Sequence, residues 1–288
     1  IFLHSIEHTR LSYPGVGLAW NYDTPQWVMQ QSSKILAKGL SHPAIFNDEV
    51  IMEGLMQAGL PPAEACLYQH STCVEITPIA SSNVYVASPY INLLQLLHDI
   101  FGVPSLSGDS GSKASKELGK AEPATFDGLL QIYRQHLSAA VHEAVINENT
   151  GQATRRYNGG FPLLSCFVND CLARGKDIDH GGARYNWIEP SFVGLSNLID
   201  SLTAVRRYVY EEKAVSLSEL IEALKTDFAG KEDLRQMLLN RAAKYGNDED
   251  EVDTLAITIS EWVRQEVQMY KTYLGGKFLS GFIVWIMH

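Results

Sequence analysis

Short apolar segments, separated by long stretches with helical spacing, constrain the fold of this chain more than any other feature. The apolar segments lie at residues 73–77, 84–86, 185–188 and 278–286. Their length and their β-branched and aromatic residues are typical of strands. Strands of this kind that alternate with helices favour a buried sheet. The pattern therefore predicts a helix-rich α/β fold, with a barrel as one of its forms.

Helix caps mark the ends of several of the helical stretches. Asn47 and Ser216 are residues of the type that caps helix N-termini, and Glu219 completes a capping box with Ser216. Gly59 and Gly102 stand where C-caps are expected. The predicted helices cover residues 25–40, 47–56, 61–68, 90–101, 125–147, 162–174, 194–211, 216–228 and 248–273.

The charge and the cysteine content exclude several classes of protein. With 23 Lys and Arg against 33 Asp and Glu, the formal net charge is -10, and the basic residues form no cluster. Neither nucleic acid nor a membrane is therefore expected as a partner. The apolar segment at residues 278–287 is too short to span a bilayer. The four cysteines are too few for disulfide bonds to stabilise a chain of 288 residues, which favours a reducing, cytoplasmic setting.

The two ends of the chain suggest how it relates to a domain. The chain begins at Ile1 and carries no signal peptide, and an apolar segment runs almost to the last residue, His288. A buried strand is normally followed by a polar turn. We therefore expect a single domain over residues 1–288 that is a fragment, truncated at both ends.

One short motif near the N-terminus matches a metal site. His4, Glu7 and His8 have the spacing of inverted zinc peptidases, in which the two histidines bind zinc and the glutamate activates water. A short match of this kind arises readily in a chain with nine histidines, and Pro14 follows soon after it. A zinc-dependent hydrolase is therefore kept as an alternative, while a plain surface turn is the simpler interpretation.

Cys73 and Glu75 form the pair that best suits catalysis. Side chains two positions apart point to the same face of an extended segment. A thiol and a carboxyl group that face one cavity can divide the work, because the sulfur reacts while the carboxyl group moves a proton. The other three cysteines, Cys66, Cys166 and Cys171, are expected to be core residues, and the last two fall on the apolar side of a predicted helix.

The surroundings of this pair strengthen the hypothesis. Further segments follow in a set order and at set separations: Asn47–Val50, Ala63–Tyr68, Asp170–Asp177, Gly181–Asn186 and Gly194–Leu202. Together with the Cys-Val-Glu segment, they make the chain resemble the glycyl radical enzymes, the pyruvate formate-lyase-like superfamily. The resemblance covers most of the chain from about Ser33 to Tyr210, and more loosely the part to His288.

The resemblance implies a fold and a reaction. The fold would be part of a barrel of two five-stranded half-barrels surrounded by α-helices, with Cys73 at the tip of a hairpin inside it. Cys73 would form a thiyl radical that takes hydrogen from a small organic substrate under anaerobic conditions, and Glu75 would move a proton. No metal or cofactor is expected in the chain itself. The radical would be stored on a glycine that this chain lacks, installed by a radical S-adenosylmethionine iron–sulfur activase.

Departures from the family pattern bear on the substrate. Pyruvate formate-lyase has two adjacent cysteines, whereas Thr72 precedes the single Cys73 here, so formate acetyltransferase activity is doubtful. Many eliminases of the family have a glycine at the place of Thr72 and an aspartate at the place of Ala87, which weakens a diol-dehydratase assignment. The hypothesis is therefore a radical lyase that cleaves a C–C, C–O, C–N or C–S bond.

Four residues are candidates for substrate binding: Thr72, Arg184, Tyr185 and Asn186. Tyr185 and Asn186 can line the barrel or satisfy backbone groups of a strand. Arg184 can pair with a substrate carboxylate or with a structural acid. Two further options stay open, namely a homodimer and a catalytically silent barrel that serves only as a binding module.

Overall fold

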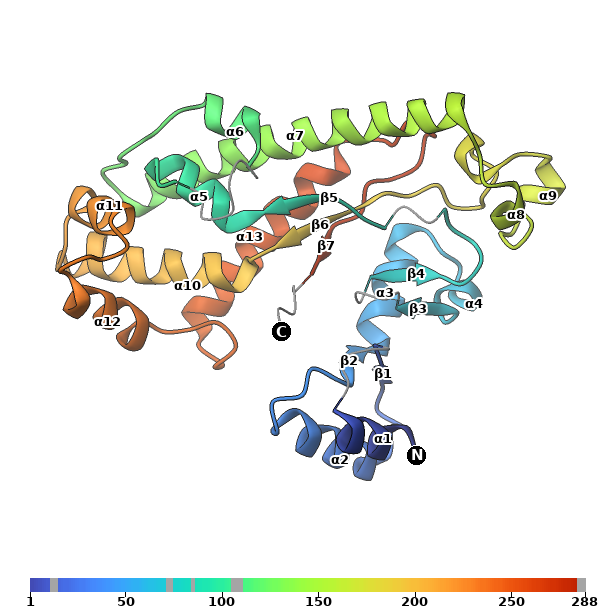
Figure 1. The fold of residues 1–288 in the computed structure, drawn as a ribbon, viewed down its shortest axis with the longest axis horizontal. Helices are drawn as coiled ribbons and strands as arrows, with labels where there is room; N and C mark the ends of the chain where they lie inside the picture. The colour runs from blue at the N-terminus through green and yellow to red at the C-terminus, as the bar shows by residue number, and fades with distance from the viewer. Residues whose placement is uncertain (11–14, 71–74, 84–85, 105–110, 284–288) are drawn as a thin grey trace. The chain divides into compact units, whose positions relative to one another are not determined.

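The computed structural model describes residues 1–10, 15–70, 75–83, 86–104 and 111–283. The chain divides into two compact units. Unit 1 comprises Ile1–Val86, Gly160–Tyr185 and Trp285–His288, and unit 2 comprises Ala87–Gly159 and Asn186–Val284. Figure 1 gives the labels of the elements.

Unit 1 combines short strands with short helices. Its elements are α1 (Phe2–Thr9), β1 (Gly17–Trp20), α2 (Gln26–Leu36), β2 (Ala44–Asn47), α3 (Asp48–Ala58), α4 (Pro62–Ala65), β3 (Tyr68–His70), β4 (Ile76–Pro78), α8 (Pro162–Ser165), α9 (Cys171–Arg174) and the 3-10 helix η1 (Ile178–His180). β1 and β2 pair in parallel, whereas β3 and β4 pair antiparallel.

Helix α3 shows how local sequence sets an element of unit 1. The side chain of Asn47 accepts a hydrogen bond from the backbone N–H of Val50, and Gly59 ends the helix with a φ of 109°. An Asx N-cap and a glycine in the left-handed region are the expected helix ends. Both predicted caps are thus confirmed.

Unit 2 is larger and holds the long helices. Its elements are β5 (Val86–Asn92, the first residue of which belongs to unit 1), α5 (Leu93–Phe101), α6 (Lys113–Glu117), α7 (Phe126–Asn158), β6 (Glu189–Val193), α10 (Leu195–Val205), the π-helix η2 (Arg206–Glu211), α11 (Leu217–Lys225), α12 (Glu232–Arg241), α13 (Asp250–Gln268) and β7 (Gly281–Phe282). β5, β6 and β7 lie side by side in that order, and β6 pairs with β7 in parallel (Figure 1).

The core of unit 2 lies between its sheet and its helices. α5 packs against α7 and α10, and α10 packs against α13. Tyr133, Phe192, Leu198 and Ile259 are almost completely buried there. Burial of apolar side chains of this size stabilises the folded state by roughly 1.5–3 kcal/mol each.

The α/β, helix-rich fold class is confirmed, although several element ends differ from the predictions. The predicted helix at residues 162–174 is two short helices, α8 and α9, because Asp170 adopts a left-handed φ of 74° between them. The helix predicted from residue 90 begins at Leu93, since β5 extends to Asn92 and Asn92 caps α5. Among the described residues, the strands form three open sheets and no closed barrel. No helix in the described part of the chain is long and apolar enough to cross a membrane.

Candidate functional site

The Cys-Val-Glu segment lies in the connection between two antiparallel strands of unit 1. β3 and β4 pair up to His70 opposite Ile76, and the connection runs between these two residues. Glu75 ends the connection, and its side chain is only 5% exposed. Thr72 and Cys73 lie outside the described residues, so the structure does not test them. The described residues on either side of the connection are thus an antiparallel strand pair, with a buried Glu75 directly before β4.

His70, at the end of β3, packs against the other strand pair of unit 1. Its ring stacks on that of Phe46 in β2, with ring centroids 4.9 Å apart and an interplanar angle of 7°. A Cβ added to Gly17 of β1 would come within 2.2 Å of the His70 ring. Glycine in a strand often marks such a close approach. The β1–β2 pair therefore anchors the start of the connection.

The Gly-Gly-Ala segment that precedes Arg184 forms a tight turn that requires small residues. Gly181 ends η1 with a φ of 78°, a conformation that favours glycine. Gly182 donates its N–H to the carbonyl of Asp177 at 2.9 Å, and a Cβ added to it would come within 2.0 Å of the carbonyl oxygen of Lys176. Ala183 is completely buried. These three small residues allow the chain to turn tightly just before Arg184.

Arg184 and Tyr185 both contact the same carboxylate on α4. The Arg184 guanidinium donates from Nη1 to Oε1 of Glu64 and from Nη2 to Oδ1 of Asp170, each at 2.8 Å. Its Nε lies 3.3 Å from Oδ2 of Asp170. The Tyr185 hydroxyl donates to Oε2 of Glu64 at 2.9 Å. One arginine and one tyrosine thus join the segment after η1 to α4 and to the start of α9.

The pKa shifts in this cluster favour fixed protonation states. The hydrogen bonds from Arg184 hold the pKa of Asp170 below its usual value, and the same contact raises the pKa of Arg184. Burial, followed by the hydrogen bond to Glu64, raises the pKa of the Tyr185 hydroxyl. Asp170 and Arg184 therefore stay charged and Tyr185 stays neutral near neutral pH, which suits a structural network better than proton transfer.

The backbone of Tyr185 contacts the chain that follows β4. Its N–H donates to the carbonyl of Ser81, and its carbonyl accepts from the N–H of Asn83, both at 3.0 Å. The N–H of Asn169 donates to the carbonyl of Ala80 at 2.7 Å in the same region. Backbone pairing of this kind fixes the register of the two segments. The Tyr185 segment is thus bonded to the chain after β4 as well as to α4.

Asn186 lies in unit 2, whereas Arg184 and Tyr185 lie in unit 1. The carbonyl of Asn186 accepts a hydrogen bond from the Thr272 hydroxyl at 3.2 Å. A Cβ added to Gly276 would come within 1.7 Å of that carbonyl oxygen. The structure therefore brings Arg184 and Tyr185 together with Glu64, and it places the backbone of Asn186 against a different loop.

The residues of the zinc alternative do not form a metal site. His4, Glu7 and His8 lie on α1, but both histidines are exposed. Glu7 is paired with Lys38 and accepts a hydrogen bond from Gln31 at 2.7 Å. Among the described residues, no group of three or more His, Cys, Asp and Glu side chains could hold a metal ion. The motif is therefore part of a surface helix.

The described cysteines differ in exposure. Cys171 is 1% exposed, as expected of a core residue. Cys66 and Cys166 are exposed, so the expectation that these two cysteines lie in the core is wrong. Cys166 follows α8 directly, before the turn at Asp170, which explains why it does not continue a buried helix face.

Two acidic residues of the cluster were not among the predicted site residues. Glu64 and Asp170 both bind Arg184, and Glu64 also binds Tyr185. Glu64 lies 120 positions before Arg184 in the chain, so no local spacing links the two. The signal that could have pointed to them is the presence of both segments within the same family resemblance.

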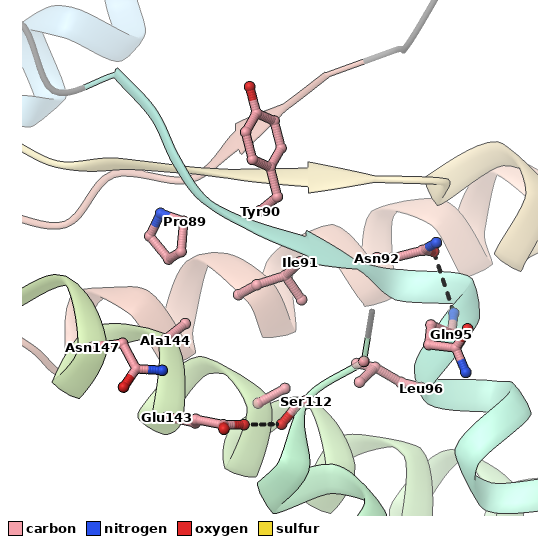
Figure 2. Close-up of a pocket in the computed structure, with 12 residues that line it drawn as sticks. Pro89, Tyr90, Ile91, Asn92, Gln95, Leu96, Ser112, Glu143, Ala144 and Asn147 are labelled. Carbon is pink, nitrogen blue, oxygen red and sulfur yellow. Dashed lines mark hydrogen bonds between the residues drawn. The ribbon is translucent and has the colours of Figure 1, made fainter. Parts of the chain in front are cut away.

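A separate cavity lies within unit 2. It has a volume of about 210 Å³, and Figure 2 shows Glu143 and Ser112 at its wall. The Ser112 hydroxyl donates to Oε2 of Glu143 at 2.5 Å, and the N–H of Ala114 donates to the same oxygen at 3.2 Å. The acid of this cavity is therefore engaged in holding the N-terminus of α6.

Comparisons with known proteins identify relatives of this chain. The family model described as pyruvate formate lyase-like matches residues 1–288. A trans-4-hydroxy-L-proline dehydratase from Clostridioides difficile is 29% identical over 283 residues, which cover 96% of this chain and 35% of the relative. An isethionate sulfite-lyase from Nitratidesulfovibrio vulgaris is 26% identical over 96% of this chain and 34% of the relative.

The fold of the chain is similar to that of a solved enzyme structure. The glycerol-bound, B12-independent glycerol dehydratase from Clostridium butyricum aligns with a TM-score of 0.80 at 30% identity. The alignment covers 97% of this chain and 35% of that enzyme. The chain thus spans about a third of the length of the proteins that it matches.

Proposed function

Because the chain belongs to the pyruvate formate lyase-like family, we propose that it forms part of a glycyl radical lyase. In this proposal Cys73 is the thiyl-radical residue, and Glu75 transfers a proton during the reaction. The resemblance assigns both roles, and the matching dehydratase and sulfite-lyase relatives support an enzyme of this class.

The observation that carries the proposal is the burial of Glu75 at the end of the hairpin connection that contains Cys73. A carboxyl group that is 5% exposed is shielded from bulk water. A sulfur radical must also be shielded, because water and oxygen would consume it. The strands on either side of the connection are paired and anchored, so the position suits two groups that work on one substrate.

The proposed reaction moves one hydrogen atom out and back. The Cys73 sulfur takes a hydrogen atom from a substrate carbon, which forms the S–H bond and leaves the unpaired electron on that carbon. Glu75 carries the proton from the hydroxyl group of the radical carbon to the leaving group on the next carbon. The C–O or C–S bond then breaks, and water or sulfite departs. The product radical takes the hydrogen atom back from Cys73, so the overall reaction is redox-neutral.

The radical that starts this cycle is not generated by Cys73 or Glu75. In the family, a backbone glycyl radical supplies the acceptor for the Cys73 hydrogen, and an iron–sulfur activase that uses S-adenosylmethionine installs it. An activase of this kind, a small-molecule substrate and an anaerobic cytoplasm are therefore part of the proposal.

The relatives narrow the class of bond that is cleaved. Dehydratases break a C–O bond and sulfite-lyases break a C–S bond, so both classes of relative remove a heteroatom group from their substrate. We therefore place elimination of a heteroatom group ahead of decarboxylation. Thr72 and Ala87 depart from the common eliminase pattern, so the substrate is expected to differ from a simple diol.

A test requires an enzyme of the relatives' length that contains this sequence, co-expressed anaerobically with its activase. Electron paramagnetic resonance should show the doublet of a glycyl radical, and a panel of hydroxylated and sulfonated substrates should identify the one converted. Glu75→Gln should keep the doublet and lower kcat by about a hundredfold or more, since acid–base catalysis contributes on this scale.

Glu53→Gln is the matched control, because Glu53 lies exposed on α3. If Glu75→Gln turns over like this control, the proton-transfer role of Glu75 is wrong. If no substrate is converted although the doublet is present, the silent binding module becomes the better account.

A further inference from the structure

We infer that Arg184 and Tyr185 are positioning residues, which with Glu64 hold both arms of the hairpin that carries Cys73 and Glu75. The upstream arm is α4 and β3, and the downstream arm is the chain from β4 to Asn83. This inference builds on the proposed function, since it assigns a role relative to Cys73 and Glu75.

The upstream arm is held through side chains. Glu64 lies on α4, and its carbonyl accepts from the N–H of Leu67, immediately before β3. Its two carboxylate oxygens bind separate donors, Oε1 the Arg184 guanidinium and Oε2 the Tyr185 hydroxyl. Charge-assisted hydrogen bonds of this kind are stronger than neutral ones and fix the direction of the acceptor.

The downstream arm is held through the backbone. The N–H and carbonyl of Tyr185 bond to Ser81 and Asn83, which follow β4. The N–H of Ile79, directly after β4, also donates to the carbonyl of Leu67, directly before β3, and this hydrogen bond joins the two arms. The same tyrosine therefore contacts one arm with its hydroxyl and the other with its main chain.

Asp170 and Arg174 orient Arg184 itself. Asp170 accepts from the Arg184 guanidinium and, at 2.9 Å, from Nη2 of Arg174. Nη1 of Arg174 in turn donates to the carbonyl of Ala183 at 2.8 Å, directly before Arg184. Asp170 thus fixes the guanidinium of Arg184, and Arg174 fixes the backbone directly before that residue.

This geometry separates the two alternatives for Arg184. A substrate carboxylate would have to displace Glu64 or Asp170, and the displaced acid would lose its counter-charge. Both acids already face the guanidinium at 2.8 Å. The contacts therefore favour the structural acids as its partners, and the benefit to catalysis is the placement of Glu75 and its hairpin within the small tolerance that reactions require.

The first experiment measures hydrogen–deuterium exchange in the enzyme of full length that contains this sequence. Tyr185→Phe removes only the hydroxyl that binds Glu64. We expect the amides of β3 and β4 to exchange about tenfold faster, because a hydrogen bond to a charged group is lost. Tyr22→Phe is the control, since Tyr22 is 79% exposed in the same unit. Equal exchange in the two variants would overturn the inference.

A double-mutant cycle tests whether Tyr185 acts through Glu64. Tyr185→Phe and Glu64→Gln weaken the same hydrogen bond, so the effects on hairpin exchange should be less than additive. Fully additive effects would mean that the two residues hold the hairpin independently, and this result would overturn the inference.

The second experiment uses the activated enzyme of full length. A positioning role predicts that Tyr185→Phe lowers kcat, with KM and the glycyl doublet unchanged. A raised KM with an unchanged kcat would make Tyr185 a substrate contact and overturn the inference. Failure of the proposed function is distinguished by Cys73→Ala: if that variant still converts substrate, the catalytic assignment fails while the exchange result on the hairpin stands by itself.

Discussion

Gly182 lies so close to the carbonyl oxygen of Lys176 that no side chain fits at its position. A Cβ there would come within 2.0 Å of that oxygen. Gly175 in the same unit has a φ of 60°, yet a Cβ added to it would meet no atom within 4 Å. The two glycines are therefore needed for different reasons, one for space and the other for backbone conformation.

Replacing each glycine by alanine should separate these reasons. Gly175→Ala is expected to cost about 1–2 kcal/mol of unfolding free energy, the usual penalty of a left-handed residue. Gly182→Ala must displace backbone and should cost more than about 3 kcal/mol. Chemical denaturation followed by circular dichroism measures the unfolding free energy of both variants. Similar losses would show that the close contact at Gly182 is absent.

The residues of the site were predictable to different degrees. Alternation along a strand and the family resemblance point to Cys73 and Glu75 without a structure. The partners of Arg184 could not be predicted in this way, because Glu64 lies 120 positions away and a half-buried Glu on a short helix has no distinctive spacing. Contacts between distant segments depend on tertiary packing, which the local sequence does not specify.

At the scale of elements, helix ends with capping side chains are predicted well. Ser216 and Glu219 form the predicted capping box of α11, and Asn47 caps α3. Ends without such a signal are predicted less well, as at Asp170, where a left-handed residue interrupts a predicted helix. The strands are short and shifted by several residues, since an apolar run does not mark where pairing begins.

A chain of hydrogen bonds links three helices of unit 2. The Ser115 hydroxyl of α6 donates to Oδ2 of Asp99 at 2.8 Å and lies 3.0 Å from Nδ1 of His136. His136 belongs to α7 and is 2% exposed. Burial lowers its pKa below the usual value of 6.5, although the charge of Asp99 opposes this shift.

The lowered pKa of His136 makes the stability of unit 2 depend on pH. Below about pH 6.5 the unfolded chain binds a proton at this histidine while the folded chain does not, so stability falls as the pH falls. His98, whose pKa burial also lowers, contributes in the same direction. His136→Asn should reduce the loss of unfolding free energy between pH 7 and pH 5. A slope equal to that of the unchanged protein would contradict this account.

At the scale of the whole molecule, the sequence predicts the family more firmly than the substrate. The α/β class and the relation to glycyl radical barrels are confirmed by a solved relative with a TM-score of 0.80. The chain spans about a third of such enzymes, so groups that choose the substrate can lie in parts that these 288 residues do not include. Composition and spacing do not reveal these groups.

The most direct test of the central claim is substrate conversion by Cys73→Ala in the activated enzyme of full length. Cys166→Ala is the matched control, because Cys166 is an exposed thiol in unit 1. Both variants should show the glycyl doublet, and the account predicts that conversion is lost only in Cys73→Ala. Conversion that continues in Cys73→Ala at the rate of the control would contradict the account.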